Sequence, residues 1–279
     1  MTRLEIDFNC RYGGFVPYPK ATEADVAFFR EHGWIAVPDA VAPDDLVDLA
    51  EKCQQIIDHK ESMAFDWAWE EGTPRDQREF KIVQSSPSIF WQGHFDDAPF
   101  RLWAVEFATA LMGIDLQFWY DQLLAKPPHK SVATRWHQDE GYWGRNLDDR
   151  GITCWMPLHD VDPSNGCMHF IDGGHREGVV EHHNPAEIAS DLLECHPDES
   201  RAVAVPLAVG GVTFHHSKTP HMTTPNVTDT WRRILTQHLC AVGGAEEGDH
   251  YPWKVTVNQM TGEVIASPAR SGRRSPGSR

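Results

Sequence analysis

Hydrophobic and polar positions follow two different spacings along this chain. In the first part, apolar residues recur at helical spacing, first after a capping-box pattern at Thr22–Asp25 and again from Pro43 to about residue 59. The segment Trp34–Val37 between them has the composition of a strand, and a further helix is expected at Phe100–Met112. The N-terminal part is therefore predicted to be mainly helical.

From Lys81 onward, short β-rich segments are separated by Pro, Gly and Asn. The strands expected there are Gln117–Leu124, Ile152–Leu158, Cys167–Ile171, Val203–Leu207, Val212–His216 and Arg233–Cys240. Helices followed by strands predict an α+β protein, mainly β, built on an antiparallel sandwich or barrel. We expect one domain over residues 1–267 with a β core at about 81–240, and a disordered tail at 268–279 that is rich in Ser, Gly and Arg.

Composition narrows the class of partner. The chain has 279 residues, of which 41% are hydrophobic and 11 are Trp, so a globular domain is expected. The net charge of -16 disfavours nucleic acid and anionic membranes as partners. The six cysteines are dispersed, and neither a signal sequence nor a membrane-length apolar run is evident, which predicts a reducing, cytoplasmic location.

The stretch TRWHQDEGYW, residues 134–143, carries the first candidate chemistry. If it forms a strand, His137 and Asp139 point to the same face and Gln138 points away. The segment VTFHHSKTPHMTTPN, residues 212–226, contains three histidines and is the best source of a third ligand. Two histidines and one carboxylate form the facial triad of non-haem Fe(II) oxygenases. An isolated His-x-Asp pattern is common, so the context has to support this interpretation.

Arg232 supplies part of that context. It follows His221 by eleven residues, which is enough chain for a turn and a return in the adjacent antiparallel strand. Its planar guanidinium can bind a carboxylate through two hydrogen bonds and keeps its charge. Arg232 is therefore a candidate anchor for a dicarboxylate cosubstrate.

Three motifs in this order resemble the phytanoyl-CoA dioxygenase family of Fe(II)- and 2-oxoglutarate-dependent oxygenases: WHQDEGYW, SNGCMHFIDGGHREG at 164–178, and HMTTPN followed by WRR. The resemblance extends from about Thr22 to His238. It implies a double-stranded β-helix, or jelly roll, with the N-terminal helices packed outside. It also implies hydroxylation of an unactivated C–H bond with O2, releasing succinate and CO2.

The same resemblance implies roles for individual residues. It implies that His137, Asp139 and His221 bind Fe(II), that Arg232 pairs with the distal carboxylate of 2-oxoglutarate, and that Thr223 hydrogen-bonds the same end. Further positions implied to contact the cosubstrate, or to orient the ligands, are Gln122, Gln138, Trp155 and Lys81. The usual Pro-Gly-Ser-His of the family is Asp172-Gly173-Gly174-His175 here.

Other residues near the motifs have simpler interpretations. His215 and His216 are expected to pack or to support the ligands, although either is a fallback ligand. The pair His182–His183 is interpreted as a solvated loop, and Trp155 could equally be ordinary core. Glu140 is expected to place a negative charge near the mouth of the site, where it would disfavour an anionic substrate group.

Two other functional classes stay open at this stage. The same three ligands could hold zinc and activate water for hydrolysis, in which case Arg232 and Trp155 would have no assigned task. The scaffold could also be a non-catalytic binding protein. Of the oxygenase substrates, a small polar metabolite is favoured over an acyl-CoA, since the acidic chain offers no basic patch for phosphates apart from its tail.

Overall fold

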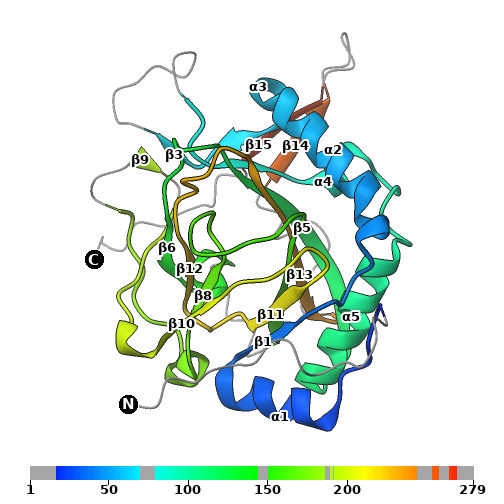
Figure 1. The fold of residues 1–279 in the computed structure, drawn as a ribbon, viewed down its shortest axis with the longest axis vertical. Helices are drawn as coiled ribbons and strands as arrows, with labels where there is room; N and C mark the ends of the chain where they lie inside the picture. Colours follow the sequence, from blue (N-terminus) through cyan, green and yellow to red (C-terminus); the bar gives the residue numbers. More distant parts are fainter. Residues whose placement is uncertain are drawn as a thin grey trace, which may run out of the picture.

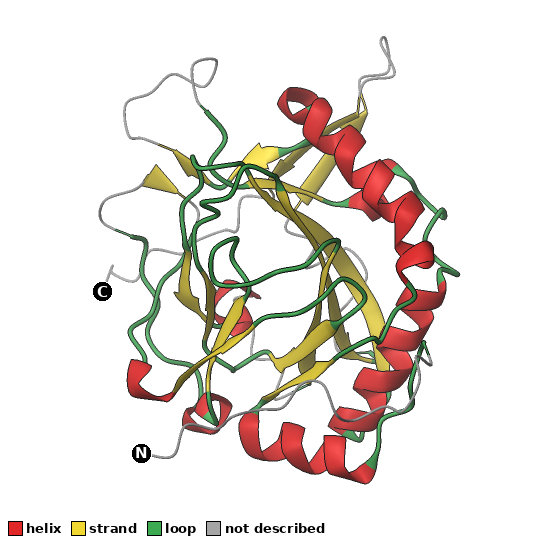
Figure 2. Ribbon diagram, in the orientation of Figure 1, coloured by secondary structure: helices red, strands yellow, loops and turns green. Residues whose placement is uncertain are grey.

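Two antiparallel sheets face each other in this protein, and helices cover the outer face of the larger sheet (Figure 1). Figure 2 shows the same arrangement, with the longer helices in red along one side and one end of the strands. The computed structural model describes residues 17–69, 79–143, 150–185, 189–190, 192–243, 253–257 and 264–268.

The predicted helices are present. The helical elements are α1 (Glu23–His32), η1 (Pro43–Leu46), α2 (Val47–Asp58), α3 (Lys60–Met63), α4 (Pro87–Phe90), α5 (Pro99–Met112), α6 (Asp139–Trp143), η3 (Gly174–Glu177) and η4 (Glu199–Arg201). The capping box before α1 is confirmed, because the Thr22 hydroxyl accepts from the Asp25 N–H at 3.2 Å and the Asp25 carboxylate accepts from the Thr22 N–H at 2.9 Å.

The larger sheet has the order β1-β11-β7-β13-β5-β4-β2 and the smaller one β10-β8-β12-β6. The strands of the larger sheet are β1 (Trp34–Val37), β2 (Phe65–Asp66), β4 (Val83–Ser85), β5 (Leu116–Lys126), β7 (Gly151–Pro157), β11 (Val212–His216) and β13 (Arg232–Ala241). Those of the smaller sheet are β6 (Thr134–His137), β8 (Met168–Ile171), β10 (Ala202–Val205) and β12 (His221–Thr223). Two further pairs are formed by β3 (Ala68–Trp69) with β9 (Ala189–Ser190) and by β14 (Trp253–Val257) with β15 (Val264–Pro268).

Successive strands alternate between the two sheets from β5 to β8 and again from β10 to β13, and β9 belongs to neither sheet. This alternation is that of a jelly roll, so the predicted double-stranded β-helix with outer helices is confirmed. The β structure extends beyond the expected core of 81–240, because β1 and β2 join the larger sheet and β14 and β15 follow it. Pro268, which was assigned to the tail, is the last residue of β15, and residues 269–279 lie outside the described residues.

Both faces of the larger sheet are buried, as the continuous apolar run of β7 requires. On β7, Ile152, Cys154 and Met156 pack in the cluster that includes the helices α1, α2 and α5. Trp155 packs between the two sheets with residues such as Phe170 of the smaller sheet. The alternation of side chains along each strand therefore separates a helix-covered face from an interior face.

The C-terminus of α1 is fastened to the segment that leads to β12. Gly33 ends the helix with φ of 78°, which glycine adopts without strain, and a Cβ there would lie 2.2 Å from a ring atom of His175. The Gly33 carbonyl accepts from the His216 N–H at 2.9 Å and from the Thr219 hydroxyl at 2.6 Å. The first helix therefore contacts the loop that precedes His221.

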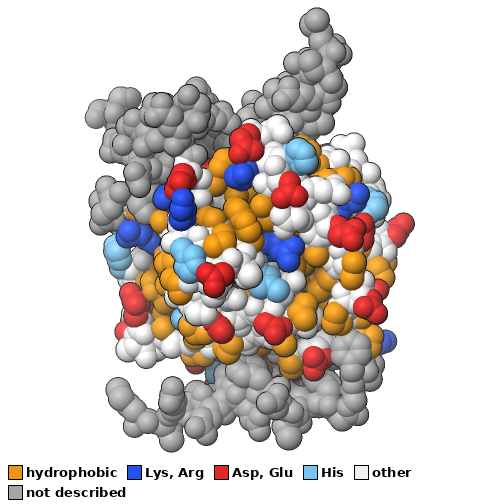
Figure 3. All heavy atoms as spheres, turned by 45° about the horizontal axis from the view of Figure 1, so that its top comes forward, with side chains coloured by type: hydrophobic (Ala, Val, Ile, Leu, Met, Phe, Trp, Pro, Cys, Tyr) orange, Lys and Arg blue, Asp and Glu red, His pale blue; other side chains and the backbone are white. Residues whose placement is uncertain are grey.

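The surface shown in Figure 3 mixes acidic, basic and hydrophobic side chains. Among the helices of the described residues, none has the length and apolar character needed to cross a bilayer.

A buried ion pair joins α5 to β5 on the helix-covered face of the larger sheet. The Arg101 guanidinium donates to the Asp121 carboxylate at 2.6 Å, and both side chains are almost fully buried. Asp121 also accepts from the Ser86 hydroxyl at 2.7 Å and from the Ser88 hydroxyl at 2.6 Å. The carboxylate therefore connects α4, α5 and the sheet.

Replacing Arg101 with Met is expected to lower the free energy of unfolding by about 3–5 kcal/mol, because a buried carboxylate then loses its cation. Urea denaturation measures this value. Asp96, the other and largely exposed carboxylate near Arg101, provides the control. Asp96→Asn should change the stability by less than about 1 kcal/mol, and equal effects of the two substitutions would contradict the role given to the buried pair.

Candidate metal and cosubstrate site

Three potential metal ligands converge between the sheets. His137, Asp139 and His221 are all buried, and their ligand atoms lie within 4.8 Å of one another. His137 ends β6 and His221 begins β12, and these two residues are paired across the antiparallel ladder, with ring centroids 4.1 Å apart. The structure thus brings together the three residues that the sequence selected.

The expected strand geometry of the His-x-Asp motif is wrong. The strand β6 ends at His137, and Asp139 is the first residue of α6, so strand alternation does not align the two side chains. A turn does so instead, and the amide of Gln138 holds it by donating to the carbonyls of Gly178 at 2.7 Å and Lys218 at 2.6 Å. The side-chain Oε1 atom of Gln138 also accepts from the Val180 N–H at 2.9 Å. Both the nitrogen and the oxygen of the side-chain amide thus bind backbone groups. A contact of this amide with a cosubstrate stays a prediction.

Both histidines are oriented for metal binding. The Nδ1 atom of His137 lies 2.7 Å from the Arg135 carbonyl, and that of His221 lies 2.9 Å from the Thr219 carbonyl. A carbonyl only accepts, so each Nδ1 carries the proton and each Nε2 has a free lone pair. Burial lowers the pKa of both rings, which keeps them neutral as a metal requires.

Asp139 is held as a carboxylate by its neighbours. Burial alone would raise its pKa, but His221 and His215 lower it to well below its usual value. Its Oδ2 atom accepts from the Thr153 hydroxyl at 2.5 Å and lies 3.2 Å from Nε2 of His215. Its Oδ1 atom lies 3.6 Å from Nε2 of His221. His215 therefore supports a ligand, as the sequence interpretation preferred, and is absent from the three-residue group.

A second feature, a pair of buried cations, lies on neighbouring strands of the larger sheet. Lys126 at the end of β5 and Arg232 at the start of β13 are paired across the ladder, and both are almost completely buried. The Lys126 ammonium donates to the Thr223 hydroxyl at 2.8 Å and to its carbonyl at 3.1 Å, and also to the Thr224 carbonyl at 2.7 Å. Arg232 donates to the Leu124 carbonyl at 3.2 Å and to the Thr223 hydroxyl at 3.3 Å.

These two cations have no acidic partner among the described residues. Burial, and then the charge of Arg232, lowers the pKa of Lys126 well below its usual value, and burial lowers the pKa of Arg232 to about 9. The Nε atom of Arg232 is buried without a hydrogen-bond partner. Two buried positive charges and an unused donor beside Thr223 fit an anionic ligand. A carboxylate group of such a ligand, bound beside Thr223, would balance the buried charge and accept a hydrogen bond from the free donor.

The interior face of β5 and β13 continues from these cations toward the triad. Gln122 is paired with Thr236, and the side-chain Oε1 atom of Gln122 lies 3.0 Å from Nε2 of His238. Nδ1 of His238 lies 2.9 Å from the Thr153 hydroxyl, which in turn donates to Asp139. A continuous polar chain therefore connects Gln122 to a metal ligand.

Two other residues, Trp155 and Lys81, are implied to contact the cosubstrate, and they lie in different surroundings. Trp155 faces the interior beside Thr236, where it packs with Phe170 and Ile234. The backbone N–H of Lys81 donates to Asp66 at 2.9 Å, and its positive charge lies near that residue and Glu79. No described interaction joins Lys81 to the triad, so its contact with the cosubstrate stays a prediction, as does that of Trp155.

Two interpretations of neighbouring polar residues need correction. Glu140, in α6, is 6% exposed, so its side chain is buried rather than solvent-exposed, and its effect on an anionic substrate group stays a prediction. His182 is half-buried rather than solvated, because its Nε2 accepts from the Gln138 N–H at 3.0 Å. His183, by contrast, is exposed and contacts the buried Glu194.

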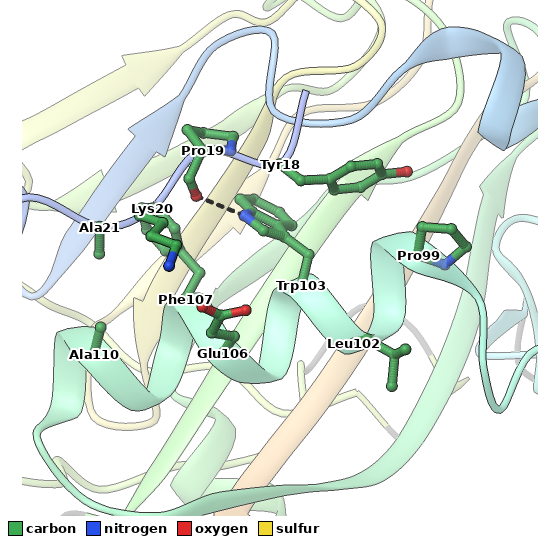
Figure 4. Close-up of a pocket in the computed structure, with 10 residues that line it drawn as sticks. All are labelled: Tyr18, Pro19, Lys20, Ala21, Pro99, Leu102, Trp103, Glu106, Phe107 and Ala110. Atoms are coloured by element: carbon green, nitrogen blue, oxygen red, sulfur yellow. Dashed lines mark hydrogen bonds between the residues drawn. The ribbon is translucent and has the colours of Figure 1, made fainter. Parts of the chain in front are cut away.

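The groove shown in Figure 4 is separate from these residues. It lies between α5 and the segment 18–21, where Trp103 donates to the Pro19 carbonyl at 2.8 Å. Lys20 and Glu106 are its charged lining residues, and none of the sequence-selected site residues lines it.

Lys126, Thr153 and His238 were not among the predicted site residues. Tyr120, Gln122 and Lys126 have the same parity along β5 and thus share a face, but the expected strand Gln117–Leu124 ended two residues before Lys126. The preference of lysine for the surface also concealed this residue.

The family model for phytanoyl-CoA dioxygenase (PhyH) matches residues 29–234 of this chain. The chain belongs to the phytanoyl-CoA dioxygenase family. The matched range contains the triad, Arg232 and Lys126, so the geometry above is that of a family member.

Individual relatives are distant. A Bos taurus protein named phytanoyl-CoA dioxygenase domain-containing protein 1 is 30% identical over 125 residues, which cover 43% of each chain. The chain thus matches less than half the length of that relative. The L-proline trans-4-hydroxylase of Streptomyces griseoviridis is 25% identical over 171 residues, or 57% of each chain.

A solved structure extends the similarity to most of the fold. EvdO2 from Micromonospora carbonacea var. aurantiaca, crystallised in complex with 2-oxoglutarate, is 25% identical with a TM-score of 0.62. The alignment covers 84% of this chain and 96% of that chain.

His215 can be tested as a positioning residue for Asp139. We expect His215→Leu to weaken Fe(II) binding by about 10–100-fold, because the Asp139 carboxylate loses the donor that orients it. Anaerobic titration with Fe(II) measures the affinity. His215→Gln retains an N–H donor and should recover part of the loss, whereas equal losses in both variants would indicate only a packing defect.

Proposed function

We propose that this protein is an Fe(II)- and 2-oxoglutarate-dependent oxygenase that hydroxylates an unactivated C–H bond of a small, polar metabolite. The observation that carries the proposal is the buried pair Lys126 and Arg232, which has no acidic partner among the described residues and lies beside the strand that begins with His221. A hydrolytic zinc site would leave these two buried cations without a task. A dicarboxylate cosubstrate uses both.

The residues have distinct tasks in this proposal. His137, Asp139 and His221 would hold the metal. Arg232 and Thr223 bind the distal carboxylate of 2-oxoglutarate, with Lys126 behind them. Together the iron and cosubstrate supply an oxidant from O2, with release of succinate and CO2.

An aromatic wall beside the triad supports an enclosed reaction. Tyr142 of α6 contacts the ring of His137 edge-on with centroids 5.4 Å apart. Trp143 donates to the Tyr120 hydroxyl at 2.7 Å, and Tyr120 stacks on His238. We infer that these rings exclude water from the reacting centre and line the substrate's approach.

The substrate class follows from the same wall and from the polar chain. Gln122, His238 and Thr236 offer hydrogen bonds to a polar substrate on the interior face. One relative is named as a hydroxylase of L-proline, which is a small polar molecule, and this name supports a small polar substrate here. Hydroxylation is supported by the intact Asp139, since a halogen ligand would need a smaller residue in its place.

Anaerobic addition of Fe(II) and then 2-oxoglutarate to metal-free protein should give the visible charge-transfer band of the iron chelate. His221→Ala should abolish the band, and Arg232→Met should raise the 2-oxoglutarate concentration needed by at least about tenfold, which is 1.4 kcal/mol of lost carboxylate binding. Arg233→Met is the matched control, because the neighbouring Arg233 lies on the opposite face of β13 and donates to Gln54.

Tight metal binding by the wild-type protein without any band would overturn the oxygenase proposal and favour the zinc hydrolase. A band with equal cosubstrate affinity in the Arg232 and Arg233 variants would overturn the assignment of Arg232. Once the band is established, succinate release on addition of candidate metabolites identifies the substrate.

Lys126 predicts a pH dependence of cosubstrate binding. Its pKa is lowered in the free protein, and a nearby carboxylate stabilises the ammonium form and raises that pKa again. Binding therefore takes up a proton between the two pKa values, and the affinity, which is highest below the lower value, falls as the pH rises from the lower to the upper one. Calorimetry in buffers of different ionisation enthalpy measures the proton uptake, which Lys126→Met should remove. Uptake that persists in Lys126→Met would assign it to another group.

A further inference from the structure

A second cluster of metal-ligating side chains lies outside the triad, behind β6. His183, Glu194 and His196 each offer a ligand atom, and these atoms lie within 4.8 Å of one another. Glu194 is buried, whereas the two histidines are exposed. The cluster therefore combines solvent access with an anchored carboxylate.

The backbone fixes the arrangement of this cluster. His183 and Glu194 form an antiparallel bridge, with N–H to carbonyl distances of 3.0 and 2.8 Å in the two directions. The two side chains are thus direct cross-strand neighbours, and Nε2 of His183 lies 3.2 Å from Oε1 of Glu194. His196 is two residues beyond Glu194, and its ring centroid lies 5.0 Å from that of His183.

Arg135 holds the carboxylate from the other side. Its guanidinium donates to Oε2 of Glu194 at 2.9 Å, while Oε1 faces His183. This division resembles the support that ligating carboxylates commonly receive from a neighbouring donor, which orients the other oxygen toward the metal. The cation also offsets the charge of Glu194, so affinity for a metal is expected to be lower than at an unpaired carboxylate.

We propose that His183, Glu194 and His196 form a second metal site, which binds a borderline divalent transition ion of the Zn2+ class. Two imidazoles and one carboxylate are one of the ligand sets that hold Zn2+ in three-ligand protein sites, with water completing the coordination. Fe(II) precedes Zn2+ in the general order of site affinity, so Zn2+ competes better here.

The segment that carries this second site also supports the wall of the first one. The Cys195 N–H donates to the Trp136 carbonyl at 2.7 Å, next to His137. The Leu193 N–H donates to the Tyr142 hydroxyl at 2.7 Å, and Tyr142 contacts the ring of His137. Metal bound by Glu194 and His196 therefore ties their segment, which contacts β6 and α6, to His183.

Zn2+ titration of metal-free protein tests the proposal, with calorimetry to count bound equivalents. We expect two equivalents for the wild-type protein, one for His196→Ala, and one for the variant His137→Ala/His221→Ala, which lacks the inner site. Combining the three substitutions should leave none. His129→Ala, at an exposed histidine that pairs with Asp229, is the matched control and should retain two.

A thermal readout gives an independent check. In the His137→Ala/His221→Ala background, saturating Zn2+ should raise the melting temperature, and adding His196→Ala should remove this shift. Ligand-field absorption of Co2+ in the same background should change when His183 is replaced by Ala. The second site would be overturned if the background variant binds no saturable equivalent, or binds it equally with and without His196.

Discussion

A buried carboxylate among imidazole rings constrains most of the interior of this protein. Asp139 is 7% exposed and keeps its negative charge because His221 and His215 surround it and Thr153 donates to it. Such a charge is tolerated in a protein interior only when its oxygens have donors or a metal. The positions of β6, β11 and β12 follow from this requirement, since each of these strands supplies one of the surrounding histidines.

The jelly roll satisfies that requirement through its alternation of strands. Successive strands enter opposite sheets, so residues from β12 and β13, close in sequence, face each other across the interior. Arg232 is brought into contact with Thr223, two residues beyond His221, in this way. Helices on the outer face free the inner face of the larger sheet for polar residues, because apolar burial is provided elsewhere.

The sequence allowed the elements and the clustered ligand candidates to be predicted, but not the contacts that bring them together. The helical spacing and capping box at Thr22 are local signals, and so is the apolar run of β7, which explains their agreement with the structure. His137 and Asp139 do lie together, but for a different geometric reason from the one expected, because the turn held by Gln138 depends on three distant backbone groups. Lys126 was missed for a similar reason, since its burial depends on long-range pairing with β13.

The contact between α1 and the ligand loop limits how far this protein can be shortened. The Gly33 carbonyl is hydrogen-bonded by His216 and Thr219, and the Thr219 carbonyl in turn orients the ring of His221. A fragment that begins after Gly33 would keep every proposed ligand of the inner site and yet lose the restraint on one of them. The smallest functional unit for engineering therefore begins before the first helix, although no iron ligand is proposed there.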